Sequence, residues 1–157
     1  MVKRASTRLW LLRRLKFLGA SSEDLVEIYT KQIRCILELA APAWQGGISQ
    51  AEKQDLERVQ KSATCIILGP AYTNYKNALE KLQLDSLEDR RNKLSLKFAL
   101  KSEKHAKFNS WFKPATKAIN TRMKVSKYCD VKANHARFTN SPISFLTRLL
   151  NLYYKHH

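Results

Sequence analysis

The sequence is poor in the residues that build phosphate-binding loops and disulfide frameworks. Its 157 residues include only four glycines, four prolines and three cysteines. Four glycines cannot supply the familiar glycine-rich phosphate loops. Cys35, Cys65 and Cys129 are an odd number without close spacing, which argues against a disulfide framework. They therefore predict an intracellular protein, nuclear or cytoplasmic, in a reducing compartment.

Long apolar runs are also missing. No uninterrupted apolar stretch approaches the roughly 18 residues that a transmembrane helix needs. The apolar run from Trp10 to Leu12 is broken at once by Arg13 and Arg14, which excludes a signal peptide. We expect no membrane partner. The alternative is a basic amphipathic segment that lies on an anionic membrane surface, because both ends of the chain have this character.

Acidic residues are scarce. The chain has 29 Lys and Arg against 13 Asp and Glu, which gives a net charge of +16. The excess is uneven: residues 41–87 hold five basic and five acidic side chains, whereas residues 88–157 hold 16 and 4. This pattern predicts a balanced packing region followed by a cationic surface that meets a polyanion.

The clearest structural signal is the stretch from Ser49 to Pro70. Ser49 and Glu52 form a capping box, which satisfies two backbone donors at the start of a helix. Gly69 and Pro70 are placed to end that helix. The apolar residues between these signals recur at helical spacing: Leu56, Val59, Ala63, Ile66 and Ile67. The stretch is predicted to be an amphipathic helix that packs against neighbours with matching stripes.

Similar patterns predict helices over residues 4–18, from Ser21 or Ser22 to Pro42, over 74–83, from Asp85 to His105, and over 141–154. The predicted fold class is therefore all-α, an antiparallel bundle of four or five helices. The bundle is expected to occupy residues 1–105. A basic, partly extended arm over 106–140, ordered mainly when bound, and a short amphipathic segment over 141–157 follow it.

Cations are predicted to line one face of the helix that ends near His105. At 100° per residue, its basic residues fall within roughly 80° of one another. They are Arg90, Lys93, Lys97, Lys101 and Lys104. Such a line suits the phosphate backbone of a duplex, although a solvated helix face has the same pattern. Arg13 and Arg14 are further candidates for phosphate contacts, or the polar face of a core helix.

Aromatic residues are interleaved with the basic residues of the arm: Phe108, Trp111, Phe112, Tyr128 and Phe138. They either stack on unpaired bases or hold the arm on its own domain, and the second role is the more common one. Trp10 and Trp44 are expected in the core. Cys129 and His135 lack the further ligands of a zinc site and the orienting partner of a thiol nucleophile. We expect no catalytic residue, metal, cofactor or small-molecule substrate.

Five strings occur in an order that resembles the C-terminal end of the reverse transcriptase of non-LTR (LINE-type, jockey-like) retrotransposons. They are RLWLLRRLKFLG, IYTKQIRCILELAAPAWQGGIS, LERVQKSATCIILG, YKNALEKLQLDSLEDRRNKLSLKFALK and SPISFLTRLLN. The resemblance covers residues 4–112, is loose over 113–136 and resumes at 137–151.

The resemblance implies a helical thumb and a basic tail that grip an RNA–DNA hybrid or DNA duplex by its phosphate backbone. The polymerase centre of that family uses palm aspartates, including an Asp-Asp pair, and this sequence has no such pair. We therefore expect a nucleic-acid-binding fragment of an RNA-directed DNA polymerase, from a truncated element or an excised domain, that is not itself an enzyme. The alternative is a protein-interaction module that packs on the missing palm domain or on itself.

Overall fold

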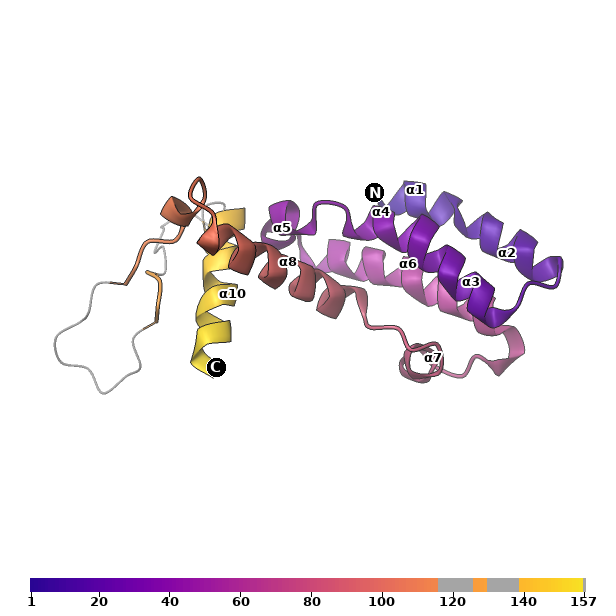
Figure 1. Cartoon of the computed structure of the whole chain (residues 1–157). Helices are drawn as coiled ribbons and strands as arrows, with labels where there is room; N and C mark the ends of the chain where they lie inside the picture. Colours follow the sequence, from indigo (N-terminus) through magenta and orange to yellow (C-terminus); the bar gives the residue numbers. More distant parts are fainter. Residues whose placement is uncertain (116–125, 130–138, 157) are drawn as a thin grey trace. The chain divides into compact units, whose positions relative to one another are not determined.

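The computed structural model describes residues 1–115, 126–129 and 139–156 (Figure 1). The predicted all-α class is confirmed: these residues are mostly helical, and they contain no β-strand, only one antiparallel bridge between Pro114 and Tyr128. The α-helices are α1 (Val2–Thr7), α2 (Leu9–Phe17), α3 (Ser22–Ile28), α4 (Cys35–Glu38), α5 (Ala41–Trp44), α6 (Gln50–Leu68), α7 (Tyr75–Lys81), α8 (Leu87–Lys104) and α10 (Pro142–His156). Shorter helical turns are η1 (Tyr29–Arg34), η2 (Gln45–Gly47), η3 (Gly69–Ala71) and η4 (Asn109–Trp111).

The chain divides into two compact units, each built from separate stretches of sequence. Unit 1 contains Met1–Leu39 and Ser49–Arg90, and unit 2 contains Ala40–Ile48 and Arg91–His157. This division differs from the predicted boundary at residue 105. The physical reason lies in α8, whose later turns carry Leu96, Ala99 and Leu100 into the core of unit 2.

Unit 1 is organised around α6. Ser49 caps this helix as predicted: its Oγ accepts a hydrogen bond from the Glu52 backbone N–H, and its own N–H donates to Glu52 Oε2 at 2.7 Å. Gly69 ends the helix with a φ of 56°. The predicted stripe is buried except for Ile66, which is half-buried. Sequence therefore located both the ends and the buried face of α6.

Three helical runs lie side by side in unit 1: α1 with α2, α3 with η1 and α4, and α6 (Figure 1). They bury one apolar face each, through residues that include Leu12, Leu25, Ile33, Leu37 and Ile67. Lys16 of α2 closes the end of α6, since its Nζ donates to the carbonyl oxygens of Ile66 and Ile67 at 2.6 and 2.8 Å. A cation at this position also suits the negative end of the helix dipole.

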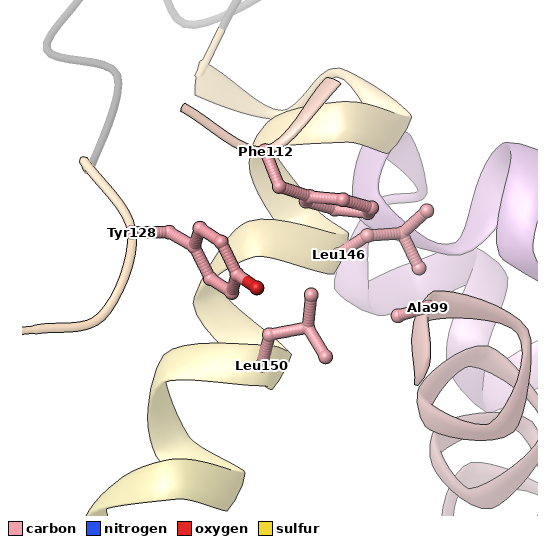
Figure 2. Close-up of a cluster of buried hydrophobic side chains, with 5 residues drawn as sticks. All are labelled: Ala99, Phe112, Tyr128, Leu146 and Leu150. Atoms are coloured by element: carbon pink, nitrogen blue, oxygen red, sulfur yellow. The ribbon is translucent and has the colours of Figure 1, made fainter. Parts of the chain in front are cut away.

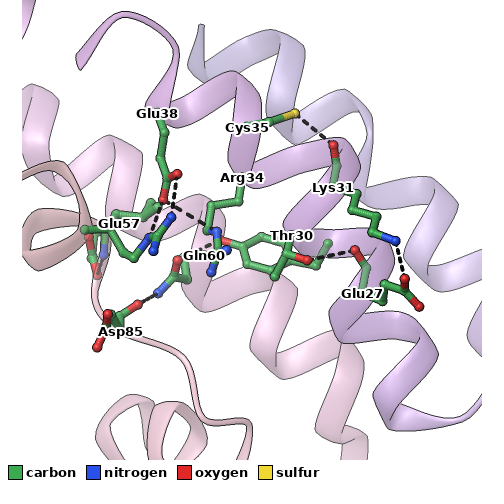
Figure 3. Close-up of polar contacts among 12 residues, drawn as sticks. Glu27, Thr30, Lys31, Arg34, Cys35, Glu38, Glu57, Gln60 and Asp85 are labelled. Atoms are coloured by element: carbon green, nitrogen blue, oxygen red, sulfur yellow. Dashed lines mark hydrogen bonds and ion pairs between the residues drawn. The ribbon is translucent and has the colours of Figure 1, made fainter. Parts of the chain in front are cut away.

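A buried polar chain crosses the core of unit 1 (Figure 3). The fully buried Gln60 accepts a hydrogen bond from the Tyr29 hydroxyl at 2.7 Å and donates to the Tyr75 hydroxyl and to the Asp85 carbonyl oxygen. The Tyr75 hydroxyl in turn donates to the Glu57 carboxylate. Burial, reinforced by nearby carboxylates, raises the pKa of both tyrosines far above the ordinary value. The two hydroxyls therefore stay protonated and act as donors.

Unit 2 has its own core between α8 and α10. Ala99, Phe112, Tyr128, Leu146 and Leu150 form a buried cluster (Figure 2). The Asn151 amide holds the Tyr128 backbone, because its Oδ1 accepts from the Tyr128 N–H and its Nδ2 donates to the Tyr128 carbonyl, both at 3.0 Å.

The described parts of the predicted arm are therefore not an extended tail. Phe112 and Tyr128 are 4% and 8% exposed, since their rings fill the space between two amphipathic helices. Residues 116–125 and 130–138 of that arm lie outside the described residues.

Candidate nucleic-acid interface

The predicted row of lysines lies along the part of α8 that belongs to unit 2. Lys93, Lys97, Lys101 and Lys104 are all exposed. Since an α-helix rises about 1.5 Å per residue, the row extends over about 16 Å. That length matches the axial rise of about five nucleotides of one DNA strand. A row of this length suits contacts to a phosphate backbone, which position a duplex without reading its sequence.

The opposite face of α8 explains why these lysines point outward. Arg91, Ser95 and Ala99 are fully buried on that face. Gln45 anchors it from η2: its Nε2 donates to Asn92 Oδ1 at 2.6 Å, and its Oε1 accepts from Ser95 Oγ at 3.2 Å. A helix fixed on one side by packing and by these hydrogen bonds presents the remaining side to solvent.

Arg90, the first member of the predicted row, has a different role. It lies in unit 1, where its Nε and one terminal nitrogen donate to the Glu38 carboxylate at 3.0 and 3.2 Å. Glu38 is largely buried and also pairs with Arg34 at 3.5 Å. The prediction that Arg90 joins the outward row is therefore corrected. The Arg90 guanidinium is bound instead to the carboxylate of Glu38, which lies 52 residues away in the sequence.

The second predicted pair, Arg13 and Arg14, is exposed on α2 of unit 1. The Arg14 guanidinium lies 5.9 Å from the centroid of the Phe17 ring. Trp10 and Phe17 are 58% and 80% exposed, so the prediction that Trp10 packs in the core is wrong. The core of unit 1 uses Leu9 and Leu12 of the same helix instead. Trp44 is half-buried, with Arg91 6.0 Å from its ring centroid.

Acidic residues do little to neutralise unit 2. Its sequence has 15 Lys and Arg and two acids, Glu103 and Asp130. Asp130 lies outside the described residues. Glu103 accepts hydrogen bonds from Lys127 Nζ and the Tyr154 hydroxyl, both at 2.7 Å, and from the Tyr128 hydroxyl. The Glu103 carboxylate is thus occupied away from the lysine row.

This cluster sets the protonation of its members. Burial alone raises the pKa of Glu103, but the hydrogen bonds from Lys127, Tyr128 and Tyr154 outweigh it and hold that pKa below its ordinary value. Burial and the bond to Glu103 raise the pKa of Tyr128 to about 12. Lys127 also lies 3.7 Å from the centroid of the Tyr154 ring. Glu103 therefore remains an anion that fastens α8 to α10, which the sequence pattern did not reveal.

The aromatic residues of the predicted arm mainly pack on their own unit. Phe112 and Tyr128 are buried with their ring centroids 5.7 Å apart. Phe108 and Trp111 contact each other, with centroids 4.8 Å apart, and both are half-buried. Phe138 lies outside the described residues. The structure thus favours packing over base stacking for Phe112 and Tyr128.

No group of three or more His, Cys, Asp or Glu side chains in the described part of the chain could hold a metal ion. His135, half of the Cys129–His135 pair, lies outside that part. Among the same residues, none of the helices has the length and apolar character needed to cross a membrane. Comparisons of the chain with family models, with curated proteins and with solved structures found no match.

Proposed function

We propose that unit 2 binds the phosphate backbone of a nucleic-acid duplex, either an RNA–DNA hybrid or DNA. The observation that carries this proposal is the row of four exposed lysines on α8 in a unit with 15 basic and two acidic residues. Phosphate contacts of this kind position a duplex without reading its sequence. Each phosphate that a lysine neutralises releases counterions, so binding weakens as salt rises.

The five sequence strings support a duplex over other polyanions, because they resemble the thumb and tail of a LINE-type reverse transcriptase. In this proposal the chain corresponds to the template–primer-binding part of such a polymerase. Arg13 and Arg14 of unit 1 are candidates for additional phosphate contacts. Arg90 is not included, because Glu38 holds it.

The test is a titration of a fluorescein-labelled RNA–DNA hybrid with the whole chain, followed by anisotropy at several salt concentrations. We expect a dissociation constant of about 10⁻⁴–10⁻⁶ M near physiological salt. Replacing Lys93, Lys97, Lys101 and Lys104 with Gln should reduce the slope of log Kobs against log salt by about 3 to 4. The same variant should also bind the hybrid more weakly at low salt, by more than about tenfold.

The matched control replaces four exposed lysines of unit 1 with Gln, so it removes the same net charge. These are Lys3, Lys31, Lys61 and Lys76. This variant should lose much less affinity and keep most of the slope. Equal losses in both variants would mean that only net charge matters and that unit 2 has no specific surface. A dissociation constant that does not change with salt concentration, or no binding at low salt, would overturn the proposal.

A further inference from the structure

Unit 2 contains an apolar groove that the lysine row does not explain. The groove has a volume of about 610 Å³ and opens to solvent. Helices α5, α8 and α10 and the turn η4 all contribute to its walls. The side chains that define it are Pro42, Phe98, Trp111, Pro142, Ile143 and Leu146.

The rim of this groove leaves large apolar side chains in water. Phe98 and Ile143 are 40% and 36% exposed, although both lie on helices whose other faces are well packed. Covering exposed apolar surface is favourable, and ligand-binding grooves are one place where such surface gathers. The groove is therefore a surface that an apolar partner would cover.

The charge around the groove restricts the partner. Lys101 is three residues after Phe98 on α8, so the two side chains are neighbours on the helix surface, and Lys97 precedes Phe98 directly. The one described acid of unit 2, Glu103, is already held by Lys127, Tyr128 and Tyr154. A second copy of unit 2 would bring 15 more basic residues, so self-association here is opposed by repulsion. The partner must be acidic.

The lining argues against a flipped nucleic-acid base. Its polar side chains are Ser141 and Ser144, and Ser141 Oγ donates to Ser144 Oγ at 3.1 Å. A base read in a pocket needs hydrogen bonds along its polar edge, which this lining does not offer. A lipid acyl chain is also disfavoured, since small-ligand sites cover 70–90% or so of their ligand and this groove is open to solvent. A peptide brings its own backbone to cover the open side.

We propose that the groove binds an amphipathic peptide segment of a partner protein, whose apolar side chains fill it and whose acidic side chains reach Lys97 and Lys101. This is the helix-in-groove mode of recognition, in which spaced apolar anchors occupy a hydrophobic channel. The proposal goes beyond duplex binding. Because Lys97 and Lys101 belong to both surfaces, peptide and duplex compete for unit 2.

The experiment selects peptides from a displayed random 16-residue library on the intact chain. The best peptide is then synthesised and its affinity measured by fluorescence anisotropy. We expect selected peptides to combine apolar residues at helical spacing with Asp or Glu. The double variant Phe98→Ser, Ile143→Ser should weaken binding by at least about tenfold, since anchor residues at the centre of an interface dominate affinity. Both side chains are partly exposed, so the variant should still fold.

Leu152→Ser is the matched control, because Leu152 is a 55% exposed apolar residue of α10 outside the groove. It should change peptide affinity by less than about twofold. Lys101→Gln should weaken peptide binding at low salt, and the peptide should displace the labelled hybrid. The groove variant should retain hybrid binding, which separates failure of this proposal from failure of duplex binding. Selected peptides that bind the groove variant equally well, that lack acidic residues, or that are displaced only by a fatty acid would overturn the proposal.

Discussion

The two units have similar lengths but use charge in opposite ways. Unit 1 has 14 basic and 11 acidic residues, and unit 2 has 15 and two. In unit 1 the acids are part of the structure, since Glu38 holds Arg34 and Arg90 and Glu57 accepts from Tyr75. Unit 2 has one described acid, Glu103, and its buried polar positions hold Arg91 and uncharged side chains such as Gln45, Ser95 and Thr147.

This difference shows where the chain tolerates self-repulsion. Surplus positive charge destabilises a compact state, and unit 1 avoids most of that cost by pairing. Unit 2 keeps part of its surplus, four lysines, on an exposed face of α8. A polyanionic partner would offset the repulsion on binding, which is why the proposed duplex site lies in unit 2.

The largest loss of stability is expected from a substitution in the core of unit 1. Gln60→Ala removes an acceptor for Tyr29 and donors to Tyr75 and Asp85, and leaves a small cavity. We expect a loss of about 3–4 kcal/mol in the free energy of unfolding. Gln54→Ala, at an exposed position of the same helix, should cost less than about 0.5 kcal/mol. Urea unfolding followed by circular dichroism measures both.

Tryptophan fluorescence can assign that loss to one unit. Trp10→Phe leaves Trp44 and Trp111, which both belong to unit 2. In this background, the Gln60→Ala transition seen by fluorescence should shift less than the one seen by circular dichroism. Identical shifts would mean that the two units unfold as one and that their separation has no thermodynamic meaning.

The packing of unit 2 depends on a glycine. A Cβ atom at Gly46 would lie 2.7 Å from Phe145 Cβ and 2.9 Å from the Asn140 carbonyl oxygen. Gly46→Ala should therefore destabilise unit 2 by about 1–3 kcal/mol. At Gly47 the nearest atom would be 3.8 Å away, so Gly47→Ala is a control with a much smaller expected effect. Fluorescence-detected urea unfolding in the Trp10→Phe background would show the difference, and equal costs would contradict it.

Glu103 makes the stability of unit 2 depend on pH. Its pKa is depressed in the folded state, so its contribution is present above the unfolded pKa of about 4.3 and is lost as the pH falls through the folded pKa. Glu103→Gln should cost about 1–2 kcal/mol at pH 6. The difference from the parent chain should shrink as the pH drops below about 4.

The control for this prediction is Glu80→Gln, at an exposed position of α7 in unit 1. It should leave the urea midpoint at pH 6 almost unchanged. A cost for Glu103→Gln that stays constant from pH 6 to pH 3 would show that the charge of Glu103 is not what fastens α8 to α10.

The smallest effect separates two cations of the same helix. Arg90→Gln should cost unit 1 about 1 kcal/mol, because Glu38 loses one of its two partners, and should leave hybrid affinity within about twofold. Lys97→Gln should have the reverse result, with stability nearly unchanged and the salt slope reduced by about 0.9. Urea unfolding and anisotropy titrations of both variants test this contrast. Equal changes in stability and in hybrid affinity for the two variants would contradict it.

Local signals in the sequence predicted most of the secondary structure. The cap at Ser49 lies where it was expected, and the helix predicted over 74–83 begins at Asn74, whose side chain accepts from the Asn77 N–H at 2.9 Å. The helices predicted over 85–105 and 141–154 are found as α8 and α10. These features depend on neighbours within four residues, so the sequence suffices to place them.

Contacts between distant residues escaped such reasoning. Glu38 and Arg90 are 52 residues apart, and nothing near Arg90 shows that an acid will engage it. The periodicity of residues 9–12 does not show whether Leu9 or Trp10 faces the core. Likewise, no local pattern shows that Phe98 lies on the rim of a groove.

The sequence by itself determined the helices, their caps and the cationic face of α8, because hydrogen bonding and side-chain periodicity act over a few residues. Only the tertiary structure decided that α8 is shared between two units, that Arg90 is paired within one of them, and that Phe112 and Tyr128 are buried. Those outcomes depend on which apolar and charged surfaces meet across dozens of residues, and helical periodicity carries no information about that choice.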